Sequence, residues 1–256
     1  MEYISYLNIA EHLPIQKGDI VNISSDLLKL MCITRENKEK FDPNKFLDTF
    51  LEKVGKDGTV IIPTYNWDFC SGKTFDRKNT KSQVGSLGNI ALKRDDFKRT
   101  RHPIYSHVIW GKDKEYLCSL DNITAFGKDS IFGYMYENST KNLFIGLHYR
   151  FGLTFVHYAE EIIGVDYRYN KVFSSNYIDY YGDKTKKNYQ FYVRDIEKCK
   201  STVISPLLDK KLKSNYWNKY INDIYFGIVN LRAVGDIMLE DLRQKKFEIV
   251  YPEKVK

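Results

Sequence analysis

One histidine stands out because carboxylates follow it at helical spacing. The segment Gly152–Gly164 (GLTFVHYAEEIIG) predicts a helix that Thr154 caps. His157 falls in its first turn, where the positive end of the helix dipole disfavours imidazolium and leaves the ring able to accept a proton at pH 7. Glu160 and Glu161 follow three and four residues later, so either carboxylate can orient the ring. A surface contact within a helix has the same H-x-x-E spacing, so this pair alone does not assign a function.

Two other segments carry groups that bind anions. Ser24 and Ser25 lie where a predicted strand becomes a helix, so the N–H groups of that turn can bind a phosphate or an oxyanion. Ordinary N-cap serines would look the same. The segment Lys98–His107 (KRTRHPIYSH) places three basic side chains and two histidines within ten residues, which a solvated basic loop explains equally well. Both segments need support from the rest of the chain.

The elements that must position these groups alternate between strands and helices. Asp19–Ile23 is strand-like, and Gly58–Pro63 and Asn142–Gly146 are apolar runs typical of buried strands. Asp42–Pro43 opens a helix with an N-cap residue followed by proline. Two β-rich segments around a polar turn predict a hairpin near 172–194. We therefore predict an α/β fold, with a central mixed sheet flanked by helices and an added antiparallel hairpin near 172–194.

The last quarter of the chain shows apolar residues at helical spacing. In the first series, apolar residues recur every four positions: Leu208, Leu212, Tyr216, Tyr220 and Ile224. The second series is Leu231, Val234, Met238 and Leu242. This pattern predicts helices throughout the segment.

Length and composition indicate one large domain, residues 1–256. With 256 residues, of which 43% are apolar and 29% charged, the chain buries enough surface to fold without metals or cross-links. The cysteines are widely separated, with no spacing typical of a zinc site: Cys32, Cys70, Cys118 and Cys199. No signal-peptide pattern is present and no apolar run approaches the ~20 residues that span a bilayer, so we expect a cytoplasmic protein with reduced thiols and no membrane partner.

The net charge of +7 favours anionic partners, which include nucleic acid, lipid headgroups, phosphorylated metabolites and cofactors. Motif order narrows this range. Five segments follow one another along the chain: GDIVNISSDL from Gly18, GTVIIPTYNWDF from Gly58, RTRHPIYS from Arg99, TFVHYAE from Thr154 and YRYNK from Tyr167. In this order they resemble the blocks of the aminoglycoside 3-N-acetyltransferase family of acetyl-CoA-dependent enzymes, from about Gly18 to about Leu242. Two departures are Asp26, inserted after the serine pair, and Thr100, where the family has serine.

The resemblance implies direct acyl transfer from acyl-CoA, either acetyl-CoA or a short hydroxyacyl-CoA, to an acceptor amine. His157 would be the base, and Glu160, with Asp68 as a further candidate, would orient it. It also implies a set of cofactor contacts: Ser24, Ser25, Ser82, Arg99, Arg101, His102 and Ser106. Donors for the oxyanion would lie near Ser106 or near the Ser24–Ser25 turn, and the sequence does not decide between them. No third ligand at a recognisable spacing supports a metal.

The positive net charge fits an anionic acceptor better than a polycationic drug. A branch of the same family is similar in size and N-acylates nucleotide-linked amino-deoxysugars for surface polysaccharides such as lipopolysaccharide or capsule. In that branch Tyr65 and Trp67 would contact the substrate, and Arg168 and Lys171 would meet its diphosphate, although both cations are equally consistent with surface charges on the hairpin.

The predicted function is therefore N-acylation of a dTDP- or UDP-linked amino-deoxysugar. The alternative is an aminoglycoside 3-N-acetyltransferase that confers antibiotic resistance. A non-catalytic nucleic-acid-binding protein is a third interpretation, which the scattered lysines and the lack of a binding motif disfavour. The expected partners are small molecules and not nucleic acid, and the sequence does not specify an oligomeric state.

Overall fold

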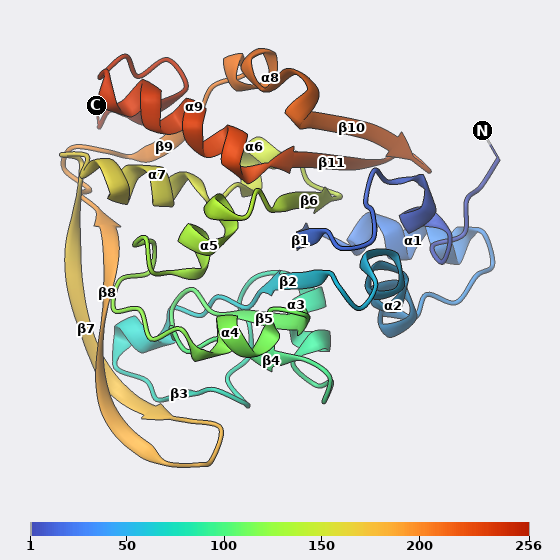
Figure 1. The fold of residues 1–256 in the computed structure, drawn as a ribbon, viewed down its shortest axis with the longest axis horizontal. Coiled ribbons are helices and arrows are strands. Elements are labelled where there is room, and N and C mark those ends of the chain that lie inside the picture. Colours follow the sequence, from blue (N-terminus) through green and yellow to red (C-terminus); the bar gives the residue numbers. More distant parts are fainter. Residues whose placement is uncertain (1, 256) are drawn as a thin grey trace.

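A seven-stranded mixed sheet runs through the middle of the protein (Figure 1). The computed structural model describes residues 2–255. Three central strands are mutually parallel: β1 (Ile20–Ser25), β2 (Thr59–Pro63) and β6 (Lys141–Ile145). Four further strands extend the sheet in antiparallel pairings: β4 (Lys98–Arg99), β5 (His107–Gly111), β10 (Tyr216–Ile221) and β11 (Ile224–Asn230). The resulting order is β10-β11-β6-β1-β2-β5-β4, which places β1 between its two parallel neighbours.

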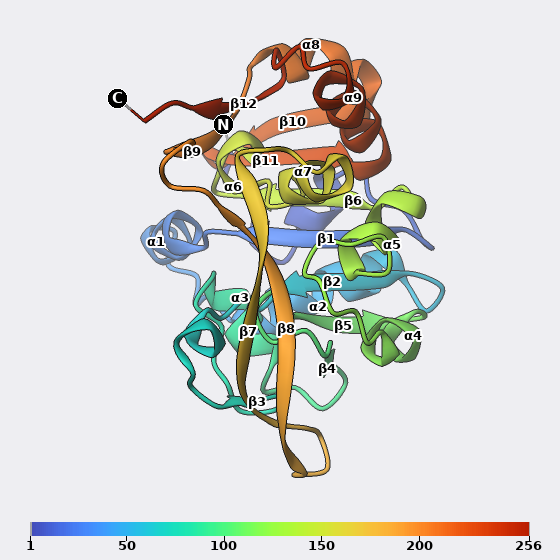
Figure 2. The same cartoon turned by 90° about the vertical axis from the view of Figure 1, so that its left-hand side faces the viewer.

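Helices cover both faces of this sheet (Figures 1 and 2). Along β2, Val60 and Ile62 pack into the core on one face, whereas Ile61 packs into the core on the other. The first core includes side chains from η1 (Ile9–His12), α1 (Leu28–Glu36), α2 (Pro43–Val54) and α3 (Ser86–Ala91). The second includes side chains from α4 (Lys114–Ser119), α5 (Ile131–Glu137), α7 (Val156–Ile163) and α9 (Leu231–Arg243). Burial on both faces explains why the central strands read as continuous apolar runs.

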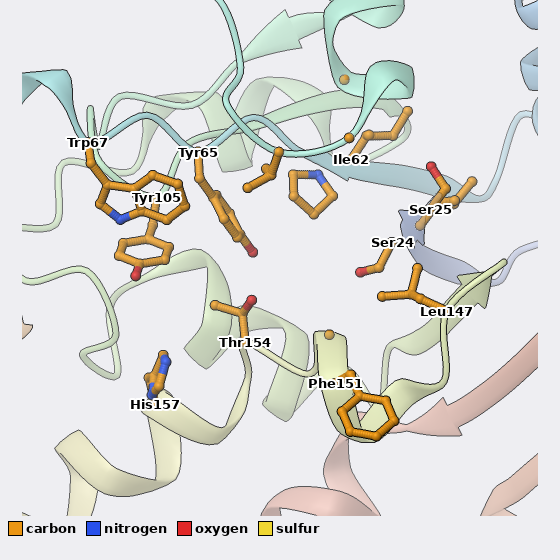
Figure 3. A pocket seen from close by; sticks show the side chains of 16 residues that line it. Ser24, Ser25, Ile62, Tyr65, Trp67, Tyr105, Leu147, Phe151, Thr154 and His157 are labelled. Carbon is orange, nitrogen blue, oxygen red and sulfur yellow. The ribbon is translucent and has the colours of Figure 1, made fainter. Parts of the chain in front are cut away.

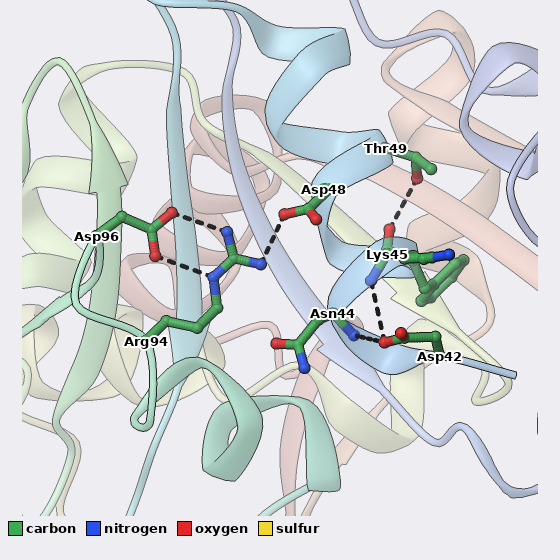
Figure 4. Close-up of polar contacts among 8 residues, drawn as sticks. Asp42, Asn44, Lys45, Asp48, Thr49, Arg94 and Asp96 are labelled. Atoms are coloured by element: carbon green, nitrogen blue, oxygen red, sulfur yellow. Dashed lines mark hydrogen bonds and ion pairs between the residues drawn. The ribbon is translucent and has the colours of Figure 1, made fainter.

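Helix α2 begins where the sequence predicted. The Asp42 carboxylate caps it by accepting the backbone N–H groups of Asn44 and Lys45 at 2.9 and 3.3 Å (Figure 4). Pro43 occupies the first helical position, where its missing N–H has no cost. The predicted cap is therefore confirmed.

Arg94 connects α2 with the segment that follows α3. Its guanidinium lies 2.6 Å from a carboxylate oxygen of Asp48 and 2.8 Å from one of Asp96 (Figure 4). The pair with Asp48 therefore ties the segment after α3 to α2, and Asp96 orients the guanidinium from within that segment. Helix α3 also contributes to the wall of the cavity described below.

A long antiparallel hairpin, β7 (Arg168–Ile178) and β8 (Lys184–Arg194), crosses the molecule from the level of α7 down past β3 (Phe75–Asp76), as Figure 2 shows. β3 pairs with β7 in parallel orientation. The ladder places Arg168 directly opposite Arg194. The predicted hairpin is confirmed and is longer at its open end than expected.

The expectation of continuous helices after residue 208 is wrong. Only α8 (Leu207–Leu212) and the turn η3 (Lys213–Asn215) are helical before strands β10 and β11 begin. The two strands meet at Asn222 and Asp223, whose φ angles of 50° and 57° match a two-residue hairpin turn. Aromatic and β-branched residues on both sides suit strands, and the i+4 spacing that suggested a helix is also an even number, as strand alternation requires. Helix α9 agrees with the prediction.

The remaining elements are short. Strands β9 (Ser201–Ile204) and β12 (Val250–Glu253) pair with each other. Two short helical segments complete the fold: η2 (Asp68–Ser71) contacts β7, and α6 (Tyr149–Gly152) contacts β11. Within residues 2–255, no helix is both long enough and apolar enough to cross a bilayer. The architecture confirms the predicted fold class, a mixed α/β sheet flanked by helices with an added hairpin.

Candidate active site

A cavity of about 380 Å³ opens at the carboxyl ends of the parallel strands (Figure 3). Ser24 and Ser25 end β1, Tyr65 follows β2, and Leu147 follows β6. Because β2 and β6 lie on opposite sides of β1, this is a topological switch point, the place where open α/β sheets bind ligands. The fold thus explains why the cavity lies here.

The walls of this first cavity are mostly apolar and aromatic. Apart from the residues at the strand ends, they consist of Ile23, Ile62, Pro63, Trp67, Val84, Gly85, Gly88, Tyr105, Phe151, Gly152, Thr154 and His157. Gly88 brings α3 close to β2, since a Cβ there would lie 2.5 Å from the Pro63 carbonyl oxygen. No carboxylate, lysine or arginine lines the cavity. His157 is its single residue with a titratable group near neutral pH.

His157 belongs to a buried charge network. Its Nδ1 lies 2.6 Å from Oε2 of Glu160, which is fully buried. The same Oε2 lies 2.7 Å from Nε of Arg168, and the Thr202 hydroxyl donates to Oε1 at 2.8 Å. Arg168 donates in addition to the Tyr192 carbonyl oxygen at 3.2 Å and to the Thr202 hydroxyl at 3.0 Å. Glu160 is therefore paired and hydrogen-bonded at both oxygens, as a buried carboxylate must be.

These contacts set the ionisation of the pair. Burial lowers the pKa of His157 below its usual 6.5, and the hydrogen bond to Glu160 offsets part of that decrease. For Glu160, burial favours a higher pKa, but the hydrogen bond to His157 and the charge of Arg168 together hold it below its usual 4.5. At neutral pH the ring is neutral and the carboxylate charged, so Nδ1–H donates to Glu160 and Nε2 has a free lone pair. This arrangement can accept a proton at Nε2.

A second cavity, of about 300 Å³, is lined by basic side chains. It shares four residues with the first: Phe151, Gly152, Thr154 and His157. Arg150, Arg168 and Arg194 also line it, and no carboxylate does. Arg194 forms no ion pair with any residue in 2–255, and Nε of Arg150 is buried without a hydrogen bond, 3.8 Å from Asp209. Among residues 2–255, Arg194 is therefore the uncompensated positive charge at this cavity, because Arg168 pairs with Glu160 and Arg150 lies near Asp209.

The structure brings several predicted site residues together. Ser24, Ser25, Tyr65, Trp67 and His157 all line the first cavity. Glu160 lies directly behind His157, and Arg168 lies behind Glu160, buried and paired with its carboxylate. Arg168 thus supports the carboxylate and is not a free cation at the surface.

Asp68, the other residue predicted to orient the base, makes different contacts. Its carboxylate accepts hydrogen bonds from Lys73 and from Gln83, each at 3.2 Å. Among the described residues, no hydrogen bond or ion pair joins it to His157. Its position gives no support to the predicted role.

Arg99 and Ser106, both predicted to contact the cofactor, are fully buried outside the cavity lining. Nε of Arg99 donates to the Ser106 hydroxyl at 2.9 Å, and Nη2 donates to the Thr64 carbonyl oxygen at 2.7 Å. The guanidinium also lies 4.7 Å from the centre of the Phe75 ring. These contacts hold β4 against the end of β2, which stabilises the cavity wall from behind.

The other predicted cofactor residues also lie away from the first cavity. His102 is buried with its Nδ1 accepting the Tyr105 N–H at 3.3 Å, and burial lowers its pKa to about 4. Arg101 pairs loosely with Asp121 at 3.5 Å and lines a separate cavity of about 250 Å³. The Ser82 hydroxyl donates to the Val84 carbonyl oxygen at 2.7 Å and so shapes the loop before α3. Their positions give no direct support to cofactor contacts.

Lys171 and Thr154 also differ from expectation. Lys171 is exposed on β7, with its ammonium 5.4 Å from the centre of the Phe173 ring, and lines neither cavity. Thr154 does not cap the helix, because α7 begins one residue later than predicted, with Phe155 as its N-cap and no side-chain cap. The Thr154 side chain is therefore available to the cavity, as Figure 3 shows.

Several residues at these cavities escaped the sequence analysis: Tyr105, Arg150, Phe151, Arg194 and Thr202. For Arg194 a signal existed, since the register of the predicted hairpin places it opposite Arg168. Thr202 lies 42 residues beyond Glu160 in a separate small sheet, and no local pattern marks it. In the described part of the chain, no group of three or more His, Cys, Asp or Glu residues could hold a metal ion.

Comparison with known proteins places this architecture. The AAC-IIIb binary structure with CoASH superposes with a TM-score of 0.76 at 15% identity, over 95% of this chain and 98% of that one. AAC-VIa bound to sisomicin superposes with a TM-score of 0.75 at 16% identity, over 95% of this chain and 99% of that one. YokD from Bacillus subtilis superposes with a TM-score of 0.72 at 17% identity, over 94% of this chain and 99% of that one. At these sequence identities the structural similarity establishes the fold alone. A search of curated proteins finds no significant match. The sequence model of the aminoglycoside 3-N-acetyltransferase family matches residues 34–237, most of the chain. This protein belongs to the aminoglycoside 3-N-acetyltransferase family and is a CoA-dependent N-acyltransferase.

Proposed function

We propose that this protein transfers an acetyl group from acetyl-CoA to an amine of an aminoglycoside-type amino sugar, with His157 as the general base. The observation that carries this proposal is the pair of His157 and Glu160, 2.6 Å apart, at the wall of a cavity at the sheet switch point. The family match supports the reaction class. The fold shared with AAC-VIa bound to sisomicin supports an aminoglycoside as the acceptor.

In the proposed reaction, the amine nitrogen attacks the thioester carbon and passes a proton to Nε2 of His157. The carbonyl electrons move to oxygen and give a tetrahedral intermediate. When the C=O bond re-forms, the C–S bond breaks and His157 returns its proton to the thiolate, so the products are an amide and free CoA thiol. Glu160 stabilises the imidazolium that forms between these steps, and Arg168 with Thr202 keeps Glu160 ionised and in place.

The first cavity suits the arm of acyl-CoA that carries the thioester. Its apolar walls can accept the pantetheine chain, and the hydroxyl groups of Ser24 and Ser25 lie at the strand end that borders it. Gly88 allows α3 to lie close to β2 along the same wall. We propose residues 1–256 as a single N-acyltransferase domain, acting in the cytoplasm where acyl-CoA is formed.

A second candidate acceptor is a nucleotide-linked amino-deoxysugar. The observation in its favour is the second cavity, which shares His157 with the first, has no carboxylate among its described lining residues and presents the guanidinium of Arg194, unpaired within residues 2–255. Such surroundings attract a diphosphate and repel a polycation. The comparisons do not support this acceptor. They also leave no support for a non-catalytic nucleic-acid-binding protein, because the chain belongs to a family of enzymes.

Measuring thiol release with purified protein and acetyl-CoA separates the acceptors. One set of reactions contains kanamycin-type amines, and the other contains dTDP- and UDP-linked amino sugars, with acetyl-CoA or a short hydroxyacyl-CoA as donor. The proposal expects release above hydrolysis with the aminoglycosides. Turnover with the sugar nucleotides alone would show that the acceptor is a nucleotide-linked amino sugar and not an aminoglycoside. If neither set of amines increases thiol release, both proposed acceptors are wrong. The His157→Ala variant controls for non-enzymatic transfer.

A further inference from the structure

The Tyr65 side chain connects the first cavity with a buried histidine. Its hydroxyl lies 3.2 Å from Nε2 of His107, which is fully buried in β5. At its other side this hydroxyl points into the cavity toward Thr154, as Figure 3 shows. The backbone carbonyl oxygen of Thr154 accepts the backbone N–H of His157 at 3.1 Å, so the Thr154 side chain stands on the segment that carries the base.

The surroundings of His107 determine the direction of its bond to Tyr65. Burial lowers the pKa of His107 to about 3, so the ring is neutral and carries one N–H. Nδ1 is buried near the backbone carbonyl oxygen of Tyr105, but no hydrogen bond of good geometry forms there among residues 2–255. A buried N–H is rarely left with so poorly placed an acceptor, so we assign the hydrogen to Nε2, which has the Tyr65 oxygen 3.2 Å away. Nε2–H therefore donates to the Tyr65 oxygen.

This direction leaves the hydrogen of the Tyr65 hydroxyl free to point away from His107 and into the cavity. Burial raises the pKa of Tyr65, and the neighbouring Thr154 hydroxyl offsets only part of that rise. The hydroxyl thus stays protonated over the whole working range of pH. The result is an O–H donor at the wall of the proposed thioester cavity, beside the Thr154 hydroxyl.

We propose that Tyr65 donates a hydrogen bond to the thioester oxygen as it becomes negatively charged, and that His107 is a positioning residue which fixes the direction of that donor. The inference rests on the proposed acyl transfer, in which nitrogen–carbon bond formation moves the carbonyl electrons to this oxygen. A donor in place before the reaction stabilises that charge without reorganisation. The hydroxyl of Ser106 cannot serve, because it lies outside the cavity and donates to the Thr64 carbonyl oxygen at 2.9 Å.

Tyr65→Phe tests the donor, because it removes the hydroxyl and keeps the ring. Loss of one oxyanion donor is expected to lower kcat by about 10²–10³-fold. The KM for acetyl-CoA and the binding of CoA measured by calorimetry should change little, since the bond forms fully only in the transition state. The matched control is Tyr136→Phe. The Tyr136 hydroxyl donates to Asp236 on the outer surface, so its removal should leave kcat unchanged.

Two substitutions test the positioning residue. His107→Phe keeps a planar ring but loses the N–H donor, so kcat should fall while CoA binding persists. His107→Gln retains an amide N–H that can replace Nε2, so it should recover most of the lost kcat. A purely structural role would instead give parallel losses of thermal stability and CoA binding in both variants, which would overturn the role of His107.

The slow hydrolysis of acetyl-CoA without an acceptor distinguishes failure of this inference from failure of the proposed function. Hydrolysis passes through the same oxyanion, so Tyr65→Phe should slow it as well. If the wild-type protein transfers or hydrolyses acetyl groups and Tyr65→Phe remains within about threefold of its kcat, the role of Tyr65 is wrong and the acyl transfer stands. If the wild-type protein binds CoA but does neither reaction, both proposals are wrong.

Discussion

Nδ1 of His157 and Nε of Arg168 approach the same oxygen of Glu160, at 2.6 and 2.7 Å. One carboxylate oxygen therefore contacts a ring that gains charge during the proposed reaction and a cation whose charge is permanent. Arg168 holds Glu160 ionised, so the carboxylate orients His157 without taking its proton. Burial keeps the resting imidazole neutral. Each of these interactions has a measurable effect.

Replacing His157 should greatly lower the rate of acetyl transfer and leave the binding of CoA intact. His157→Ala removes the only group lining the first cavity that titrates near neutral pH, so kcat should fall by roughly 10²–10⁴-fold. CoA affinity, measured by calorimetry, should stay near the wild-type value because the cavity loses no cation. A variant with wild-type turnover would show that another group takes the amine proton.

The pH dependence should reflect the lowered pKa of His157. The neutral ring is the active form, so activity is present above this pKa and is lost as pH falls through it. The acidic limb of kcat/KM should therefore lie below pH 6.5, the usual value for histidine. Glu160→Gln removes a group that raises the pKa of His157, so the acidic limb of the variant should lie at lower pH than that of the wild type. A wild-type limb at or above pH 6.5 would contradict the buried neutral base.

Glu160 should also contribute strongly to stability. In Glu160→Gln the buried Arg168 loses its ion-pair partner, and such a loss costs about 3–5 kcal/mol of unfolding free energy. The matched control is Glu137→Gln, which removes a carboxylate paired with Arg232 at the surface and should cost less than about 1 kcal/mol. Urea unfolding measures both.

The same comparison has a definite pH dependence. The folded-state pKa of Glu160 lies below its usual 4.5, so its contribution is fully present above that value and is lost as pH falls through the folded-state pKa. The difference in unfolding free energy between the wild type and Glu160→Gln should shrink below pH 4.5. A constant difference down to the acid transition would show that Glu160 does not fold as a carboxylate.

Arg194 should discriminate between the two candidate acceptors. It lines the second cavity and forms no ion pair with the described residues. Arg194→Ala removes a positive charge, so the KM should fall several-fold for a polycationic aminoglycoside and rise several-fold for a sugar nucleotide. The matched control is Lys186→Ala, exposed on the same strand outside the cavity, which should shift neither. Equal KM values for all three proteins would show that the second cavity does not hold the acceptor.

The sequence was sufficient for features that depend on local spacing. The cap at Asp42, the buried strands and the contact between His157 and Glu160 all involve residues that are close along the chain. The β10–β11 hairpin was missed because residues four apart share a face in a helix and also in a strand. The angles at Asn222 and Asp223 decided between the two, and no periodicity records them.

Other features depend on distant pairing. Arg99 is typical of a phosphate-binding residue in sequence, yet backbone carbonyls such as that of Thr64, 35 residues away, take its hydrogen bonds. Thr202 reaches Glu160 only through the placement of β9. Burial and register across separate elements set these contacts, and spacing within one element does not reveal them.

The edge pairing of β6 has a consequence for synthesis on the ribosome. β6 is complete at Ile145, but its outer neighbour β11 begins at Ile224, and the turn before β11 binds Ile4 through the Asn222 side chain at 3.0 and 2.7 Å. A nascent chain thus carries an open, apolar sheet edge until most of its length has been translated. Such edges pair readily with other chains. Chaperone binding to the chain before residue 224 is translated would protect this protein at its most aggregation-prone stage, whereas a translation pause there would prolong the exposure.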